Sequence, residues 1–592
     1  MVKDTVDLAS SALRRFDMSF GSPRLLGLLI GSLPQLRHGS LRGSLLPRLL
    51  GTSLGALLLL GSLGGCASIN SNGSALTVAV ASQFSTIDPG LNTEVVGNIA
   101  ISHMYSGMFK KDEDNNAINE LCESYEVAAD GLTYTFRLLE GIMWSDGVAI
   151  TANDFVYSYL RALSYGEDNA WAVYNFLTFV EGAAEYNARA LEAGDGFDCL
   201  AEDAGGVGVK ALDDRTLEIR LKKPCPYLPG LMSANAWLPV RADFAPQHES
   251  LWALTPGYPA SGAYELAECD GNEAVSLKKN PRYFRADEVL MDTISLKAMP
   301  DGVAQALAFQ AGEVDVAMSV STESAAGYAG TENLWIVPRC ANYFLAINSG
   351  PTGPSWAKDV SLRRALAMAI DKDALAEALG GDEFYRGLNG YVPHGLRGVS
   401  GDFRAEGDAD GYALKYDVAR AKRLLADSGY GTSNPLAIRY KYSDNDIHGA
   451  VAAALQPMWQ AVGVDVTFEA VEPGSFYDQL DAGDFEISRY GYIASDDAIQ
   501  YLDLWTGAMQ VVAAVDDPAF DKMVDAAGMI SDLAEYYRAL HAAEDYLCEE
   551  NAYVIPLFDY TSPALVKSGL RGYRSLGGDV DFIRCRFGQE PH

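Results

Sequence analysis

The most constraining feature of this sequence is the segment 101–163, because its turn signals and its hydrophobic pattern specify a compact series of elements. The elements are expected in a fixed order: a helix over 98–109, strands over 121–127 and 133–138, and an aromatic-rich helix after residue 151. Gly131 and Gly147, each preceded by Asp, supply the positive φ values that tight turns need. Thr151, three residues before Asp154, is typical of a capping box. These residues alone predict a compact α+β segment.

Length and composition restrict the class of protein. A chain of 592 residues is too long for one hydrophobic core, so two or three domains are expected. The formal net charge of −34 argues against nucleic acid or an anionic membrane surface as a partner. The eight cysteines show neither CxxC nor Cys/His spacing, so no metal site, redox site or disulfide scaffold is predicted. No cofactor is expected.

The N-terminal region has the composition of an export signal. Residues 1–65 contain seven Lys/Arg and three Asp, in contrast to the acidic remainder of the chain. The apolar run 54–63 is too short and too rich in glycine for a transmembrane helix. It ends in Leu-Gly-Gly before Cys66, which resembles a bacterial lipobox. We therefore predict a signal peptide over 1–65, a lipidated Cys66 and a tether over 66–75; cleavage nearby without lipidation, or a chance Cys, is the alternative.

The passage 133–159, TYTFRLLEGIMWSDGVAITANDFVYSY, carries the strongest resemblance to a known family. It is similar, nearly residue for residue, to the characteristic passage of the family 5 solute-binding proteins of ABC importers, the group of oligopeptide and dipeptide receptors. Shorter matches follow in the same order, at 207–229, 261–264, 277–283 and 304–315. The likeness extends from residue 76 to the C-terminal region.

The resemblance implies a mixed α/β fold of the type II-like periplasmic binding protein class, with two lobes joined by a hinge and an extra inserted domain. The expected domains are lobe I over 76–105, 235–340 and 560–592, inserted domain II over 106–234, and lobe III over 341–559. The expected elements of lobe III are strands over 341–349, 438–442, 464–470, 485–490 and 552–558, and helices over 362–379, 416–429 and 444–461.

The resemblance also implies where a peptide carboxylate would bind. Arg489 falls on the arginine that pairs with the C-terminal carboxylate of short peptides, and its planar fork suits that group. His448 matches a histidine that approaches the carboxylate of longer peptides. The lysine that performs this task in some relatives corresponds to Ala367, so one cation of the cleft is missing. Arg489 as a salt-bridge partner and His448 as a structural residue remain open alternatives.

The amino end of a ligand presents a departure from the family pattern. The expected aspartate falls on Ser495 in an ungapped comparison, and Asp496 could take its role after a shift of one residue. This departure puts a ligand with a free amino group in doubt. Asp496 and Asp497 could equally cap the helix expected over 499–504.

Further candidates follow from the same resemblance. The backbone of Gly491, Tyr492 and Ile493 and the extended segment Thr93, Glu94 and Val95 would pair with the ligand backbone. Tyr492 and Tyr174 would be aromatic residues of the cleft. The family cysteine at Cys340 has its bonding partner replaced by Ile493, so that bridge is not expected.

The predicted function is that of a monomeric, extracytoplasmic lipoprotein of an ABC transporter. It would capture oligopeptides in an interlobe cleft and deliver them to the permease. Its only contact with the membrane would be the N-terminal lipid. It would be located in the periplasm or on the outer face of the cell envelope. No catalytic motif such as HExxH or a linked Ser/His/Asp set is present, so an enzyme is not predicted. Two alternatives stay open: the same fold binding a nickel chelate, haem, sugar or opine-like solute, or a peptide-sensing receptor without transport.

Overall fold

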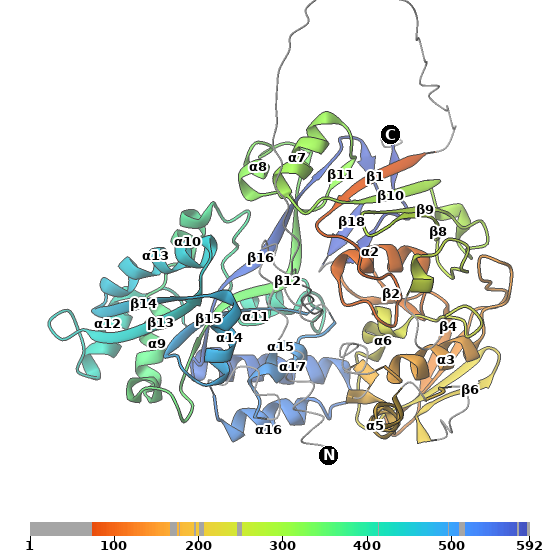
Figure 1. Ribbon diagram of the computed structural model, residues 1–592. Coiled ribbons are helices and arrows are strands. Elements are labelled where there is room, and N and C mark those ends of the chain that lie inside the picture. The colour runs from red at the N-terminus through yellow and green to blue at the C-terminus, as the bar shows by residue number, and fades with distance from the viewer. Residues whose placement is uncertain are drawn as a thin grey trace, which may run out of the picture. The chain divides into compact units, whose positions relative to one another are not determined.

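The computed structural model describes the chain from residue 74 to residue 588, with several gaps (Figure 1). The described ranges are 74–165, 175–176, 178–194, 197–199, 206–245, 251–411, 414–494, 496–507, 515–576 and 579–588. The predicted signal peptide, Cys66, Tyr174 and Ser495 lie outside these ranges.

One large mixed sheet organises the fold. Within the described residues its ten strands run in the order β14 (Val464–Val471), β13 (Leu436–Ser443), β15 (Ile487–Ile493), β12 (Leu334–Ile347), β16 (Val554–Val566), β11 (Val316–Ala317), β1 (Ala75–Val80), β10 (Thr293–Ala298), β9 (Ala274–Lys279) and β8 (Tyr264–Asp270). β12 is antiparallel to both of its neighbours, β15 and β16, whereas β1 is parallel to β10 and β11. This arrangement confirms the mixed α/β fold that the sequence predicts.

A smaller antiparallel sheet contains the segment from which the sequence analysis began. Its strands within the described chain are, in order, β4 (Cys122–Val127), β5 (Thr133–Leu138), β7 (Thr216–Arg220) and β6 (Val209–Asp213). Gly131 and Gly147 have φ of +69° and +92°, as the two Asp-Gly turns predict. The Thr151 amide donates to Asp154 Oδ2 at 2.8 Å, which is the predicted reciprocal bond of the capping box.

Three pairs of short strands complete the described sheets. They are β2 (Phe109–Lys111) with β3 (Ala117–Asn119), β17 (Leu570–Arg571) with β20 (Arg586–Phe587), and β18 (Arg574–Leu576) with β19 (Asp579–Asp581).

The helices with described bounds are α2 (Val95–Met104), α3 (Ala152–Leu163), α5 (Ala183–Ala193), α6 (Leu228–Leu231), α7 (Gly302–Ala311), α8 (Thr322–Ala326), α9 (Val360–Met368), α10 (Lys372–Leu379), α11 (Phe403–Asp410), α12 (Val418–Asp427), α13 (Asp446–Gln460), α14 (Pro473–Asp481), α15 (Ile499–Leu502), α16 (Pro518–Ala527) and α17 (Leu533–Asp545). None of the described helices is both long enough and apolar enough to cross a bilayer.

Two predicted helices differ from the structure. The helix expected over 98–109 is α2, which starts and ends earlier, since Tyr105 is already extended and Phe109 belongs to β2. The helix expected over 362–379 is two helices, α9 and α10. Asp371 separates them, because its side chain caps α10 by accepting the Ala374 amide at 3.0 Å.

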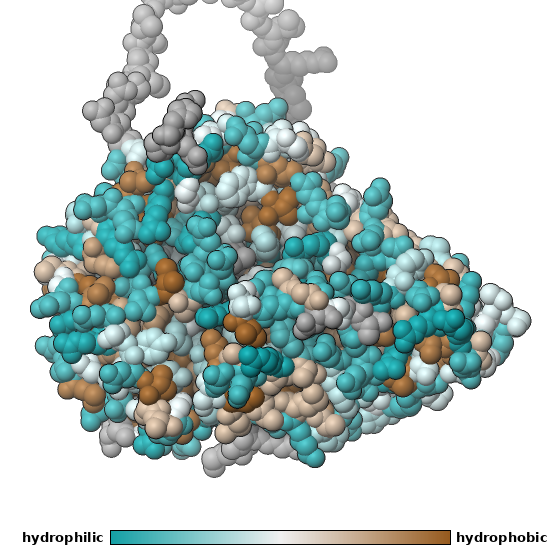
Figure 2. Space-filling model, turned by 180° about the vertical axis from the view of Figure 1, so that it is seen from behind, coloured by the Kyte–Doolittle hydropathy of each residue, from teal (hydrophilic) through white to brown (hydrophobic). Residues whose placement is uncertain are grey.

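The buried apolar residues form two large clusters. One draws on 76–316 and on the C-terminal residues 566–585, and the other on 343–558. β12 and β16 run between them, and their pairing shifts register between Pro338 and Asn342. The assignment of lobes and inserted domain to particular residues remains a prediction. Figure 2 shows that hydrophilic residues cover most of one face, with apolar residues in small groups.

Candidate ligand-binding site

β15 carries four of the predicted ligand-binding residues, Arg489, Gly491, Tyr492 and Ile493. It pairs with β12 along its whole length, from Ile487 opposite Ile347 to Ile493 opposite Ala341. Its pairing with β13 on the other side is confined to Ile487 and Ser488. Because side chains alternate along a strand, Arg489 and Gly491 face the same side of the sheet.

Arg489 lies in a buried, aromatic environment. Its side chain is only 4% exposed, and one of its Nη atoms donates to Ser443 Oγ. The guanidinium lies over the ring of Phe476 at 5.1 Å and near that of Tyr477 at 5.9 Å. Aromatic faces stabilise a cation through the ring quadrupole, so these residues hold the guanidinium in place while leaving it charged.

His448 of α13 lies near Arg489 and contacts Tyr343 of β12. Tyr343 Oη lies 3.2 Å from His448 Nδ1 and 3.5 Å from Tyr440 Oη. Burial, assisted by the Arg489 charge, lowers the pKa of His448 to about 3. His448 is therefore a neutral imidazole at physiological pH, able to exchange hydrogen bonds but not to act as a second cation.

Asp496 lies beyond the other end of β15 and is engaged by two side chains. Its Oδ1 forms an ion pair with Lys111 Nζ at 3.4 Å, and both side chains are nearly buried, at 6% and 9% exposure. Its Oδ2 accepts a hydrogen bond from Gln500 Nε2 at 3.2 Å. Lys111 belongs to β2, so the pair joins segments far apart in the chain.

Asp497 has a structural position. Its carboxylate accepts hydrogen bonds from Tyr536 Oη at 2.6 Å and Tyr537 Oη at 3.0 Å, and from the Ile499 amide at 3.0 Å. The last contact is to the first residue of α15, but Asp497 is not the N-cap of that helix, because Ala498 occupies the N-cap position. Burial raises the pKa of Asp497 to about 6.

Gly491 and Tyr492 are packed against other residues of the protein. A Cβ at Gly491 would lie 3.2 Å from the ring of Tyr560 and 3.1 Å from the Asn342 carbonyl oxygen, so close packing accounts for glycine here. The Tyr492 amide donates to Asn342 Oδ1 at 3.1 Å, and its ring meets Tyr501 edge-on at 5.1 Å. Contact of these residues with a ligand stays a prediction.

The segment 93–95 is extended only in part. Thr93 is exposed, and Glu94 has extended φ and ψ of −104° and 140°. Val95 is already the first residue of α2, so the prediction of an extended segment is wrong at that position. The cause is the bond from the Asn98 amide to the Glu94 carbonyl at 3.0 Å, which closes the first helical turn earlier than expected.

Cys340 is a free, buried cysteine with a φ of +47°. Its neighbour Ala341 pairs with Ile493 across β12 and β15. Ile493, which stands where the family has the second cysteine of a disulfide, is therefore close to Cys340. Among the described residues, no group of three or more His, Cys, Asp and Glu side chains could hold a metal ion.

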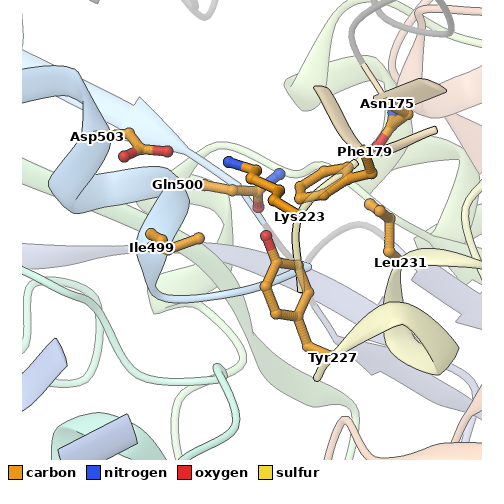
Figure 3. A pocket seen from close by; sticks show the side chains of 8 residues that line it. All are labelled: Asn175, Phe179, Lys223, Tyr227, Leu231, Ile499, Gln500 and Asp503. Atoms are coloured by element: carbon orange, nitrogen blue, oxygen red, sulfur yellow. The ribbon is translucent and has the colours of Figure 1, made fainter. Parts of the chain in front are cut away.

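A narrow crevice, whose free volume of about 10 Å³ has room for about one water molecule, lies next to Gln500 and therefore close to Asp496 (Figure 3). Its lining residues come from two parts of the chain: Asn175, Phe179, Lys223, Tyr227 and Leu231 from one, and Ile499, Gln500 and Asp503 from the other. Gln500 therefore both lines the crevice and donates to Asp496. The ring of Tyr227 stacks on Tyr536 at 5.5 Å, which brings the same two parts of the chain together.

Sequence reasoning missed Lys111, Tyr343 and Tyr560. Lys111 is one of two adjacent lysines before an acidic turn. Nothing in that pattern indicates that its partner is Asp496, 385 positions later in the chain. Tyr343 lies in a strand that the sequence did predict, and strand alternation would have placed it on one face. Its contact with His448 depends on how α13 packs, which no local pattern specifies.

The structure gathers one charged group, the Arg489 guanidinium, with neutral phenol and imidazole groups; the binding of a ligand carboxylate by this set stays a prediction. Burial raises the pKa of both Tyr343 and Tyr560, so they remain neutral hydrogen-bonding groups.

Comparison with solved structures defines the fold. The fold matches the unliganded open form of the periplasmic murein tripeptide binding protein MppA with a TM-score of 0.75 and 22% sequence identity, over 87% of this chain and 98% of that chain. The fold is that of the periplasmic binding proteins.

Sequence comparison gives the family. The oligopeptide-binding protein OppA of Bacillus subtilis is 25% identical over 86% of this chain and 92% of its own length. The probable deoxycholate-binding periplasmic protein YgiS of Escherichia coli is 27% identical over 84% of this chain and 90% of its own. The family model for bacterial extracellular solute-binding proteins, family 5 Middle, matches residues 116–510. The chain belongs to the family 5 bacterial extracellular solute-binding proteins, which are binding proteins rather than enzymes.

Proposed function

We propose that this chain captures short peptides between its two lobes and delivers them to the permease of an ABC importer. The protein would be anchored through a lipid on Cys66 at the outer side of a bacterial membrane. The observation that carries the proposal is the buried Arg489 on β15, beside His448 and Tyr343. The relatives named as oligopeptide-binding and murein tripeptide binding proteins support a peptide as the ligand.

In this proposal each end of the ligand has a defined partner. The guanidinium of Arg489 pairs with the peptide carboxylate, and neutral His448 supplies a hydrogen bond nearby. The backbone and ring of Tyr492 border the peptide chain. Asp496 meets the amino end.

The spacing of these partners sets the length of the peptide. A strand rises about 3.3 Å per residue, so Arg489 and Ile493 lie about 13 Å apart. An extended peptide spans about 3.3 to 3.6 Å per residue, so a ligand of about three to five residues would cover the distance from Arg489 to Ile493, the end of β15 that precedes Asp496.

The first experiment is mass spectrometry of ligand released by mild denaturation from the soluble chain beginning at Ala67. A mixture of peptides about three to five residues long is the expected result, as the spacing of the partners implies. A single non-peptide species would contradict the peptide proposal and leave the fold assignment intact.

A variant then tests the role of Arg489. In the wild-type protein, amidation of the peptide C-terminus should weaken binding in calorimetry, because the ligand loses its charged partner. In Arg489→Met, the free and amidated peptides should bind equally. Arg420→Met, a change at an exposed residue of α12, is the control and should keep the preference. A preference for the free acid that survives Arg489→Met would overturn the role of Arg489.

One observation favours a second candidate function. Asp496 is already paired with Lys111, which suits a carboxylate ligand that has no amino group. The relative YgiS is named as a probable deoxycholate-binding protein, and deoxycholate is a carboxylate of this kind. A calorimetric titration with deoxycholate beside a tripeptide separates the two candidates.

A further inference from the structure

We propose that Lys111 determines which ligands this site accepts, by holding the Asp496 carboxylate and competing for it with the ammonium group of a ligand. The inference rests on the proposed peptide-binding function. Its consequence is a preference: peptides with a neutral, acylated amino end should bind well compared with the same peptides carrying a free amino group.

The contacts of Asp496 carry this inference. Lys111 Nζ lies 3.4 Å from Oδ1, and Gln500 Nε2 lies 3.2 Å from Oδ2, so each carboxylate oxygen has a donor from within the protein. The backbone amide of Asp496 is directed to Gln500 as well, at 3.3 Å from Oε1. A ligand ammonium group would have to share or replace the Lys111 contact.

Burial makes that competition strong. The side chains of Lys111 and Asp496 are 9% and 6% exposed, and a like-charge approach in such a site is poorly screened by water and salt. The carboxylates of Asp496 and Asp579 outweigh the opposing effect of burial and raise the pKa of Lys111, so its amine stays protonated. The Asp579 carboxylate accepts a hydrogen bond from Asn98 Nδ2 of α2 at 3.1 Å, and this contact holds the carboxylate in position.

The identity of residue 495 agrees with this assignment. The sequence has Ser where the family pattern has the amine-binding Asp, so no carboxylate is present at that position. The nearest carboxylate along the chain is that of Asp496, and it is the one that Lys111 engages.

The test compares trialanine with N-acetyl-trialanine by calorimetry, using the ratio of the Kd for the free-amine peptide to the Kd for the acetylated peptide. In Lys111→Met this ratio should fall about tenfold or more, because Asp496 becomes available to the ammonium group. Lys111→Arg keeps the charge and should keep the wild-type ratio. Lys110→Met is the matched control, since the neighbouring lysine pairs instead with Glu120, at 3.5 Å.

A second variant covers the case in which Lys111→Met does not fold. Asp496→Asn keeps the shape of the side chain and should move the ratio in the opposite direction, because the ligand ammonium group would meet Lys111 without a compensating carboxylate. The melting temperature of each variant is recorded beside its affinities.

The outcomes are distinguishable. If both peptides bind and the ratio stays within twofold of wild type in Lys111→Met and in Asp496→Asn, the role of Lys111 is overturned and the peptide proposal stands. If neither peptide binds to the wild-type protein, the peptide proposal itself fails, and the role of Lys111 fails with it.

Discussion

At the residue scale, Asp88 and Arg161 form an ion pair that is almost fully shielded from solvent. Asp88 accepts two hydrogen bonds from Arg161, at 2.9 and 2.6 Å, and a third from Trp252 Nε1 at 2.9 Å. The pair ties the turn that follows β1 to α3. No pattern in the sequence indicated that Asp88 and Arg161 would form a pair.

Neutralising Asp88 should therefore be costly. Asp88→Asn leaves a buried guanidinium without its charge partner, and breaking a buried pair in this way costs about 3 kcal/mol or more. Urea denaturation measures the loss. Glu123→Gln is the control, since Glu123 is an exposed partner of Arg215, and it should cost less than about 1 kcal/mol. Similar losses in the two variants would contradict the argument.

Asp503 should make stability depend on pH. Burial raises its pKa to about 6, with the nearby Lys223 charge opposing the effect. Because the pKa is higher in the folded than in the unfolded state, Asp503 contributes stability that is fully present below about pH 4 and is lost as the pH rises through 6.

The check compares the wild-type protein with Asp503→Asn from pH 4 to pH 8. The free energy of unfolding of the wild type should fall by about 2 kcal/mol more than that of the variant over this range. Parallel pH profiles would show that Asp503 does not titrate in this way.

The family resemblance nominated Arg489, Tyr492 and His448, but not the side chains that surround them. Arg489 lies within the strand expected over 485–490, whereas β15 continues to Ile493 and so also contains Tyr492. Lys111 and Tyr560 come from strands remote in sequence, and packing between segments decides their contacts. A local pattern contains no information on such pairs.

At the element scale, the break between α9 and α10 shows how a cap overrides a hydrophobic pattern. The amphipathic period continues from 362 to 379, which is why one helix was predicted. Asp371 instead accepts the Ala374 amide and starts a new helix. Among the strands, β13 and β14 lie within one or two residues of the expected bounds. The other three differ more: β12 begins at Leu334 where 341 was expected, β15 ends at Ile493 where 490 was expected, and β16 ends at Val566 where 558 was expected.

Removing that cap should destabilise α10. Asp371→Ala is expected to cost about 1 kcal/mol, because the first turn of the helix loses an acceptor for one of its free amides. Asp373→Ala, two residues later in the first turn, is the control and should cost less. Chemical denaturation measures both, and an equal cost would argue that Asp371 acts through charge alone.

At the scale of the whole molecule, the turn at Gly131 meets the connection between α16 and α17. A Cβ built on Gly131 would lie 3.5 Å from the Cβ of Ser531, within the range that a disulfide needs. In the proposed function these two places move relative to each other as ligand enters.

The double variant Gly131→Cys and Ser531→Cys should form a disulfide under oxidising conditions. Its oxidised form should bind peptide more slowly in stopped-flow measurements, and reductant should restore the rate. The positive φ of +69° at residue 131 adds a small strain, so Gly131→Cys alone is the control. Unchanged association in the oxidised form would argue against motion at this contact.

The interval in which β12 and β16 lose register contains Cys340, which is 1% exposed. Burial raises the pKa of its thiol to about 12, so the sulfur is protected from electrophiles while the two strands stay packed. Alkylation of this native thiol then requires the strands to separate. The alkylation rate of Cys340, followed by peptide mapping, would report how often the molecule opens at this interval, and a ligand that holds it shut should slow that rate without any added label.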